Sequence, residues 1–189
     1  MGESVCVFIL VLYLAPAGFI YLCLRSQDCS NAGVHRPFMA GICGTKKTGA
    51  FSIVVSCHYK DDKDSGDTIY YTGTGGRKRW SDGFPRKRLR LGPQVFDQQW
   101  SDPGNEALVK SRDTGNPVRV VRSHKALSEF APAEGYRYDG CPTTDTQTSK
   151  AWKEKNPQGL DICRYRLEVN LPYSVARLEM PIMSYLPPP

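Results

Sequence analysis

The residues best suited to binding chemistry lie between Tyr59 and Arg79, where tyrosines and aspartates are followed by glycines and basic side chains. An aromatic ring can stack on an unpaired nucleobase, which is worth roughly 1–3 kcal/mol, and a carboxylate can accept a hydrogen bond from the amino group of cytosine. Tyr59 and Tyr71 could form such a stack with Asp62 at its edge. The alternative is that both tyrosines belong to the core and that the aspartates form a surface loop.

A basic run follows directly, RKRWSDGFPRKRLR at positions 77–90, with seven Lys or Arg side chains among fourteen residues. Arginine binds phosphate and guanine through paired hydrogen bonds, and Trp80, Phe84 or Leu89 could wedge into a base stack. A solvated loop and a nuclear-import patch are the alternatives. The formal net charge of +6 is compatible with a polyanionic partner.

Other site chemistries are not supported by the spacing of the reactive residues. The seven cysteines include no C-x-x-C pair and only three histidines are present, so we expect no metal site. Gly44–Ala50 lacks the Lys-Ser/Thr end of a phosphate loop, and no G-x-S-x-G nucleophile motif occurs. We therefore expect neither a catalytic site nor a cofactor.

The tyrosines and aspartates must be positioned by strands. Positions 50–59 alternate so that one face carries the larger side chains, which predicts a strand. That face consists of Phe51, Ile53, Val55, Cys57 and Tyr59. The acidic segment predicts a loop that turns at Ser65-Gly66, and TIYYT at 68–72 predicts the returning strand of a long-looped hairpin.

The rest of the chain predicts a few further elements. Strands are expected at 117–122 and 160–169, and a short helix at 105–112 with Asn105 or Asp102 near its cap and Leu108 and Val109 facing inward. Strands and short helices without regular alternation indicate an α+β fold built on a curved sheet or barrel.

The 189 residues suffice for one domain, which we place at 26–170. Val5 to Leu24 carries no charge over twenty residues, the length of a membrane-spanning helix, and the arginines after it would leave the bulk of the chain on the cytoplasmic side. An incorrectly assigned start of the chain is the other reading of residues 1–25. The proline-rich tail at 171–189 is expected to be disordered.

Five segments resemble, in order and spacing, the SRA-YDG domain, the SET- and RING-associated reader of methylated cytosine. The resemblance extends from Ser26 to about Val169. The segments are GVHRPFMAGI at 33–42, GAFSIVVSCHYKDDKDSGD at 49–67, YYTGTGG at 70–76, GNPVRVVRS at 115–123 and FAPAEGYRYDG at 130–140.

The resemblance implies a PUA-like curved β-barrel that binds hemimethylated or fully methylated CpG DNA by flipping 5-methylcytosine out of the duplex. Tyr59 and Tyr71 would sandwich the base, and Asp62 would read its Watson-Crick edge. Thr72, Gly73 and Thr74 would form the wall near the methyl group. Met39 would enter the vacated space from the minor groove. The basic finger would contact the major groove through Arg77, Lys78, Arg79, Arg86, Lys87 and Arg88.

Two departures from the family pattern bear on the site and the barrel. Cys57-His58 replaces the Gly-Gly that often precedes the first pocket tyrosine, which adds bulk near the base. CPTTDTQTSK at 141–150 stands where the family has an apolar strand, so we expect a weakened barrel there.

The expected function is that of a nuclear chromatin reader that binds double-stranded methylated DNA and is not an enzyme, with chromatin proteins as further partners. Neither a SET methyltransferase nor a RING ligase fits in the remaining residues. The alternatives are a membrane-tethered interaction protein and the DNA-binding part of a modification-dependent nuclease.

Overall fold

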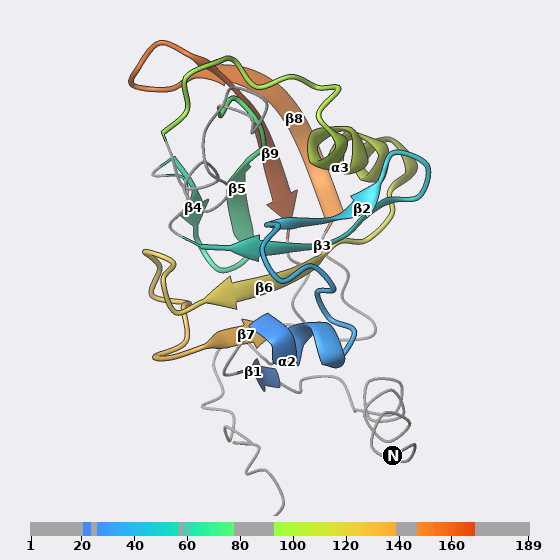
Figure 1. Cartoon of the computed structure of the whole chain (residues 1–189), viewed down its shortest axis with the longest axis vertical. Helices are drawn as coiled ribbons and strands as arrows, with labels where there is room; N and C mark the ends of the chain where they lie inside the picture. Colours follow the sequence, from blue (N-terminus) through green and yellow to red (C-terminus); the bar gives the residue numbers. More distant parts are fainter. Residues whose placement is uncertain are drawn as a thin grey trace, which may run out of the picture.

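The computed structural model describes residues 21–23, 26–56, 59, 61–77, 93–138 and 147–168. These residues form two β-sheets and two helices (Figure 1). The strands β5, β8 and β9 of one sheet run across the direction of β3 and β6 of the other, so that the two sheets enclose a core between them. This architecture confirms the predicted α+β class.

The first sheet has five strands in the order β1-β7-β6-β3-β2. β3 and β6 are parallel and the other neighbours are antiparallel. The bounds are β1 Tyr21–Cys23, β2 Ile42–Thr45, β3 Gly49–Val55, β6 Arg119–Ser123 and β7 Tyr136–Tyr138.

The second sheet has four antiparallel strands in the order β4-β5-β9-β8. β9 is one of its two inner strands and is covered on both faces, so its side chains are buried without interruption from Ile162 to Tyr165. The bounds are β4 Lys63–Asp64, β5 Thr68–Thr72, β8 Gln147–Lys155 and β9 Asp161–Glu168.

The main core lies where alternate residues of the two sheets meet the helix α3, Pro103–Thr114. β3 contributes Ile53 and Val55, and α3 contributes the fully buried Leu108. A smaller cluster lies under the short helix α2, Ser26–Asn31, which is drawn beside β1 and β7 in Figure 1.

The helix α3 begins and ends at residues with strong local preferences. Asp102 is the N-cap in an extended conformation and Pro103 occupies the first turn, where its missing N–H removes no bond. Gly115 ends the helix with φ 68°, a left-handed conformation that favours glycine. The structure therefore assigns the cap to Asp102, and Asn105 lies buried inside the first turn.

The predicted strand at 50–59 ends earlier than expected, at Val55, and one of its side chains points the other way. Partners of β2 jump from Cys43↔Ser52 to Gly44↔Ala50, which leaves Phe51 as the extra residue of a β-bulge. Phe51 is consequently 44% exposed, although the sequence pattern placed it on the same face as the buried Ile53 and Val55.

The predicted hairpin between 50–59 and 68–72 is wrong. β3 pairs with β2 and β6, whereas β5 pairs with β4 and β9 in the other sheet. The turn at Ser65-Gly66 is confirmed, because it joins β4 to β5 and Ser65 N–H donates to the Thr68 carbonyl oxygen at 2.9 Å. The long-range pairing of β5 with β9 replaces the local hairpin because it completes the core.

The structure also describes parts of the divergent segment at 141–150 and of the apolar segment near the N-terminus. Gln147–Lys150, the last four residues of the divergent segment, begin the nine-residue strand β8 of the second sheet. Residues 141–146 lie outside the described part. Of the apolar segment from Val5 to Leu24, only Tyr21–Cys23 is described, and it pairs with β7, so the sheet begins inside this segment. No helix within the described ranges is long and apolar enough to cross a membrane.

Candidate functional site

The centre of the candidate site is Asp62, whose side chain is only 9% exposed. The N–H of Thr72 donates to its Oδ1 at 2.7 Å, and Nη1 of Arg164 lies 3.9 Å from the same oxygen. Burial raises the pKa of this carboxyl group from 3.8 to about 7, although hydrogen bonds from Thr72 and the positive charge of Arg164 oppose the shift. A buried carboxyl group whose pKa lies near 7 is typical of functional sites.

Tyr59 lies at the start of the turn that leads to Asp62, since the Asp62 N–H donates to its carbonyl oxygen at 3.3 Å. The side chain is half-buried, and the guanidinium carbon of Arg77 lies 5.1 Å from the centre of its ring. Burial raises the pKa of the phenol, with Asp62 adding to the shift and Arg77 opposing it. Arg77 therefore lies over the predicted base-stacking ring.

Tyr71 lies on the core face of β5 and is 5% exposed. Its hydroxyl donates to the carbonyl oxygen of Gly41 at 3.1 Å. Burial raises its pKa well above the usual value, and Asp62 and Tyr59 contribute further, which places these three groups in one neighbourhood. Tyr71 is therefore a core tyrosine that also borders the acidic group, and its role in stacking a base stays a prediction.

The segment Thr72 to Thr74 is fixed by polar side chains from other elements. Gln98 donates from Nε2 to the Gly73 carbonyl oxygen at 2.9 Å, and Asn105 accepts from the Thr74 N–H at 2.8 Å. Any side chain at Gly73 would collide with Asn105, so glycine is required by close packing. These contacts hold the predicted wall of the pocket rigidly beside Asp62.

Sequence reasoning missed three buried polar residues that support this wall: Gln98, Asn105 and Arg164. Gln98 also accepts from the Cys163 N–H at 2.9 Å, and so joins β9 to the Gly73 segment. The sequence offered no clear signal for Arg164, because it alternates with Arg166 and Glu168 on the polar face of the predicted strand 160–169. Only the structure shows that Arg164 is buried, and a buried charged group needs a specific partner.

Met39 lies on an exposed loop next to the exposed Phe38, as a wedge that enters DNA would require. The loop is anchored by the buried His35, whose ring nitrogens lie 2.7 Å from the Ala40 carbonyl oxygen and 2.8 Å from Ser52 Oγ. Burial lowers the pKa of His35, which favours the neutral ring. The Gly41 carbonyl oxygen, which accepts from Tyr71, ties the same loop to the candidate pocket.

The basic loop has its two stems joined at one point. The N–H groups of Val95 and Phe96 both donate to the Gly76 carbonyl oxygen, at 2.7 and 2.9 Å. Of the predicted DNA-contacting cations in this loop, Arg77 is described, and Lys78, Arg79, Arg86, Lys87 and Arg88 lie outside the described residues. The loop is thus anchored next to the ring of Tyr59, through Arg77.

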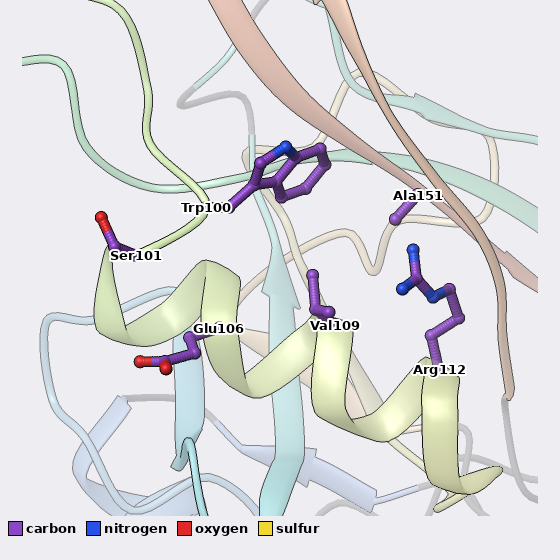
Figure 2. A pocket seen from close by; sticks show the side chains of 6 residues that line it. All are labelled: Trp100, Ser101, Glu106, Val109, Arg112 and Ala151. Carbon is purple, nitrogen blue, oxygen red and sulfur yellow. The ribbon is translucent and has the colours of Figure 1, made fainter.

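One open groove of about 530 Å³ lies between α3 and β8 (Figure 2). Its lining contains none of the predicted site residues and consists of Trp100, Ser101, Glu106, Val109, Arg112 and Ala151. Within the part of the chain that the structure covers, no group of three or more His, Cys, Asp or Glu side chains is placed to hold a metal ion.

The fold and this site define a small α+β domain with a buried acidic group near two tyrosines. The family model of the SAD/SRA domain matches residues 22–170, and the chain belongs to this family. The resemblance seen in the sequence is therefore confirmed.

Known relatives agree with this assignment. The chain is 43% identical over 140 residues to a UHRF1-like protein of Cryptococcus neoformans var. grubii. These 140 residues cover 74% of this chain and 40% of the relative. Among solved structures, it is similar to the modification-dependent TagI restriction endonuclease, with TM-score 0.67, 33% identity and coverage of 83% of this chain and 54% of that one. The SUVH5 SRA domain in complex with hemimethylated CG DNA has TM-score 0.60 and 28% identity, with coverage of 82% and 88%. The chain thus spans about two fifths of the length of this curated relative, and about a fifth of the length of the ORTHRUS proteins of Arabidopsis thaliana that it also matches.

Proposed function

We propose that this chain binds double-stranded methylated CpG DNA and captures 5-methylcytosine between Tyr59 and Tyr71, with Asp62 on the Watson-Crick edge of the base. The observation that carries the proposal is the geometry of Asp62, enclosed beside both tyrosines and fixed by the Thr72 N–H at 2.7 Å. The similarity to an SRA domain in complex with hemimethylated DNA supports the same ligand.

The energetics of the pocket are consistent with capture of one base. Flipping a nucleotide costs a few kcal/mol, which stacking on aromatic rings at roughly 1–3 kcal/mol and a hydrogen bond to Asp62 can offset. Tyr71 is held by its hydroxyl and the core, so it supplies a fixed wall. Tyr59 is half-buried at the edge of the site, so it is the ring that can adjust to the ligand.

The same proposal assigns this chain the role of a reader in nuclear chromatin. DNA recognition then needs no catalysis by this domain, and the biological outcome comes from chromatin proteins that act with it. The similarity to a restriction endonuclease covers about half of that protein, which supports recognition as the shared role and makes DNA cleavage the outcome to exclude.

A competition assay tests the proposal. One labelled CpG duplex carrying 5-methylcytosine is bound to the full chain and displaced by unmodified, hemimethylated or fully methylated duplexes. We expect methylated competitors to displace the label at concentrations at least about tenfold lower than the unmodified duplex, as one additional stacked base requires. Equal displacement by all three would contradict methyl-dependent capture, and strand cleavage in a parallel incubation with magnesium would contradict the binding-only role.

A further inference from the structure

Arg164 is a buried cation in the middle of the second sheet. It lies on β9, opposite Thr72 of β5 and Trp152 of β8 in the strand register, and is 5% exposed. Its neighbours along the strand, Cys163 and Tyr165, point into the core, so Arg164 lies on the opposite face together with Thr72. Burying a guanidinium group costs free energy unless it is paired, so we expect Arg164 to have specific polar or charged partners.

The contacts of Arg164 lead directly to the candidate pocket. Nη1 donates to Thr72 Oγ1 at 2.7 Å and lies 3.9 Å from Asp62 Oδ1. On the other side, Nε lies 3.5 Å from Oε2 of Glu154 but makes no hydrogen bond with any described residue. Glu154 therefore acts on Arg164 through its charge, and Arg164 acts on Asp62 through both charge and Thr72.

We propose that Arg164 is a positioning residue of the methylcytosine pocket, which orients Thr72 and favours the charged form of Asp62, while Glu154 partly offsets the charge of Arg164. The inference rests on the proposed function for the identity of the ligand. Thr72 connects the two groups, because its backbone N–H donates to Asp62 while its hydroxyl oxygen accepts from Arg164. The base would meet a carboxyl group that is oriented by the Thr72 N–H of β5 and whose charged form is favoured by Arg164 of β9.

The groups that face Asp62 come from three elements. Arg164 belongs to β9, Thr72 and Tyr71 belong to β5, and Asp61 and Tyr59 belong to the segment of Asp62 itself. Two further charged groups contact these residues and not Asp62 itself. The Arg77 guanidinium lies over the ring of Tyr59, and Glu154 of β8 pairs with Arg164. Among these residues, Arg164 is the cation that acts directly on the Asp62 carboxyl group, and burial and the hydrogen bonds from Thr72 affect that group more strongly.

The first test measures the charge of Asp62 without any DNA. The carboxyl carbon of Asp62 is followed by NMR against pH in the full chain labelled with carbon-13 aspartate, and its signal is assigned through Asp62→Asn. Arg164→Gln removes the attracting charge and is expected to raise the Asp62 pKa, whereas Glu154→Gln frees that charge and is expected to lower it. Arg166→Gln, a half-exposed arginine on the same face of β9, is the matched control and leaves the pKa unchanged.

Opposite shifts from two neighbouring substitutions distinguish an electrostatic role from general damage to the fold. Glu154 is exposed, so Glu154→Gln keeps the test valid even if Arg164→Gln does not fold. The inference would be overturned if the pKa of Asp62 stayed unchanged, or moved in the same direction, in folded Arg164→Gln and Glu154→Gln. It would also be overturned if Glu154→Gln alone left this pKa unchanged.

The second test measures the preference for methylated over unmethylated duplex. Arg164→Gln is expected to reduce this preference about tenfold or more, as loss of a hydrogen bond from a charged group predicts, and Arg164→Lys is expected to restore part of it. If the wild-type chain shows no preference, the proposed function itself fails. If the wild-type chain prefers methylated DNA and folded Arg164→Gln does so equally, only the role of Arg164 fails.

Discussion

Asp62 is held where its charge is unfavourable for the free protein. The unfolded chain ionises this group near pH 3.8, whereas the folded chain retains the proton to about pH 7. The native state therefore binds more protons than the unfolded state between these values, and its stability falls as pH rises through this window. Functional residues often carry such a cost to stability.

Asp62→Asn removes this titration and is expected to stabilise the free domain at high pH. The gain at pH 8 is on the order of 4 kcal/mol at most, and at pH 5 it is about a third of that, because the folded group is still neutral there but the unfolded group has already ionised. Urea unfolding at both pH values measures the difference. Asp67→Asn, at an exposed position in the turn between β4 and β5, is the control, and an equal gain at pH 5 and pH 8 for Asp62→Asn would contradict this explanation.

Tyr59 can be tested more cleanly than Tyr71, because Tyr71 belongs to the core and its truncation would cost roughly 3–5 kcal/mol of stability. Tyr59→Ala is expected to weaken binding to methylated duplex by about tenfold to a hundredfold and binding to unmethylated duplex much less. Tyr71→Phe keeps the ring and loses only the bond to Gly41, so it serves as the mild companion variant. Equal losses on both duplexes in a binding titration would argue against base stacking on Tyr59.

At the scale of elements, a buried ion pair fastens the β4–β5 hairpin to β6. Arg122 Nε and Asp64 Oδ2 are 2.7 Å apart with both side chains 2% exposed, and Arg122 also donates to the Gly66 carbonyl oxygen at 2.8 Å. Burial alone would raise the pKa of Asp64, but its hydrogen bond and ion pair with Arg122, together with bonds from Gly66 and Ser128, lower it overall. The pair orders the segment that follows Asp62.

Asp64→Asn leaves Arg122 buried without its counter-charge and is expected to destabilise the domain by about 3–5 kcal/mol near neutral pH. Because the folded-state pKa of Asp64 is lowered, its contribution is present above the ordinary carboxyl pKa and is lost as pH falls through the folded value. The gap between wild type and variant in thermal unfolding should therefore narrow in acid. A constant gap at all pH values would show that the charge of Asp64 is irrelevant, and recovery of stability in Asp64→Asn combined with Arg122→Met would support the explanation.

Local sequence signals predicted the elements that depend on local chemistry. The cap at Asp102, predicted as one of two candidates, the turn at Ser65-Gly66 and the strand at 68–72 follow from the preferences of single residues. The pairing of β5 with β9 could not be predicted this way, because nothing within either strand specifies its partner.

The candidate site was predictable to the same extent. Tyr59 and Asp62 are close in sequence and share one turn, so their proximity follows from the spacing. The supporting groups come from 25 to 92 positions away, as in the bonds of Gln98 to Gly73 and of Arg164 to Thr72, and only the tertiary fold brings them together.

At the scale of the whole molecule, the proposed function gives acidic and basic groups different roles toward one ligand. Asp62 is enclosed while the basic run extends from Arg77, so a flipped base and the phosphates around it would meet different chemistries of the same protein. Electrostatic attraction to phosphates supplies affinity that does not depend on methylation.

Arg86→Ala combined with Lys87→Ala is expected to weaken binding to methylated and unmethylated duplexes alike. The slope of affinity against salt concentration should become shallower by about one for each phosphate that the variant no longer neutralises. The matched control is Lys46→Ala with Lys47→Ala, in the exposed turn between β2 and β3 on the opposite side of the domain from β4 in Figure 1. Binding titrations at several salt concentrations that give the same slope for both double variants would remove the basic loop from the interface.

The most direct test of base capture is a crystal structure of the full chain with a short duplex that carries one 5-methylcytosine in a CpG step. Base capture requires that this cytosine lies outside the helix between the rings of Tyr59 and Tyr71, with its amino group hydrogen-bonded to Asp62. A complex in which the methylated cytosine remains paired and stacked, with the protein bound elsewhere on the duplex, would contradict it.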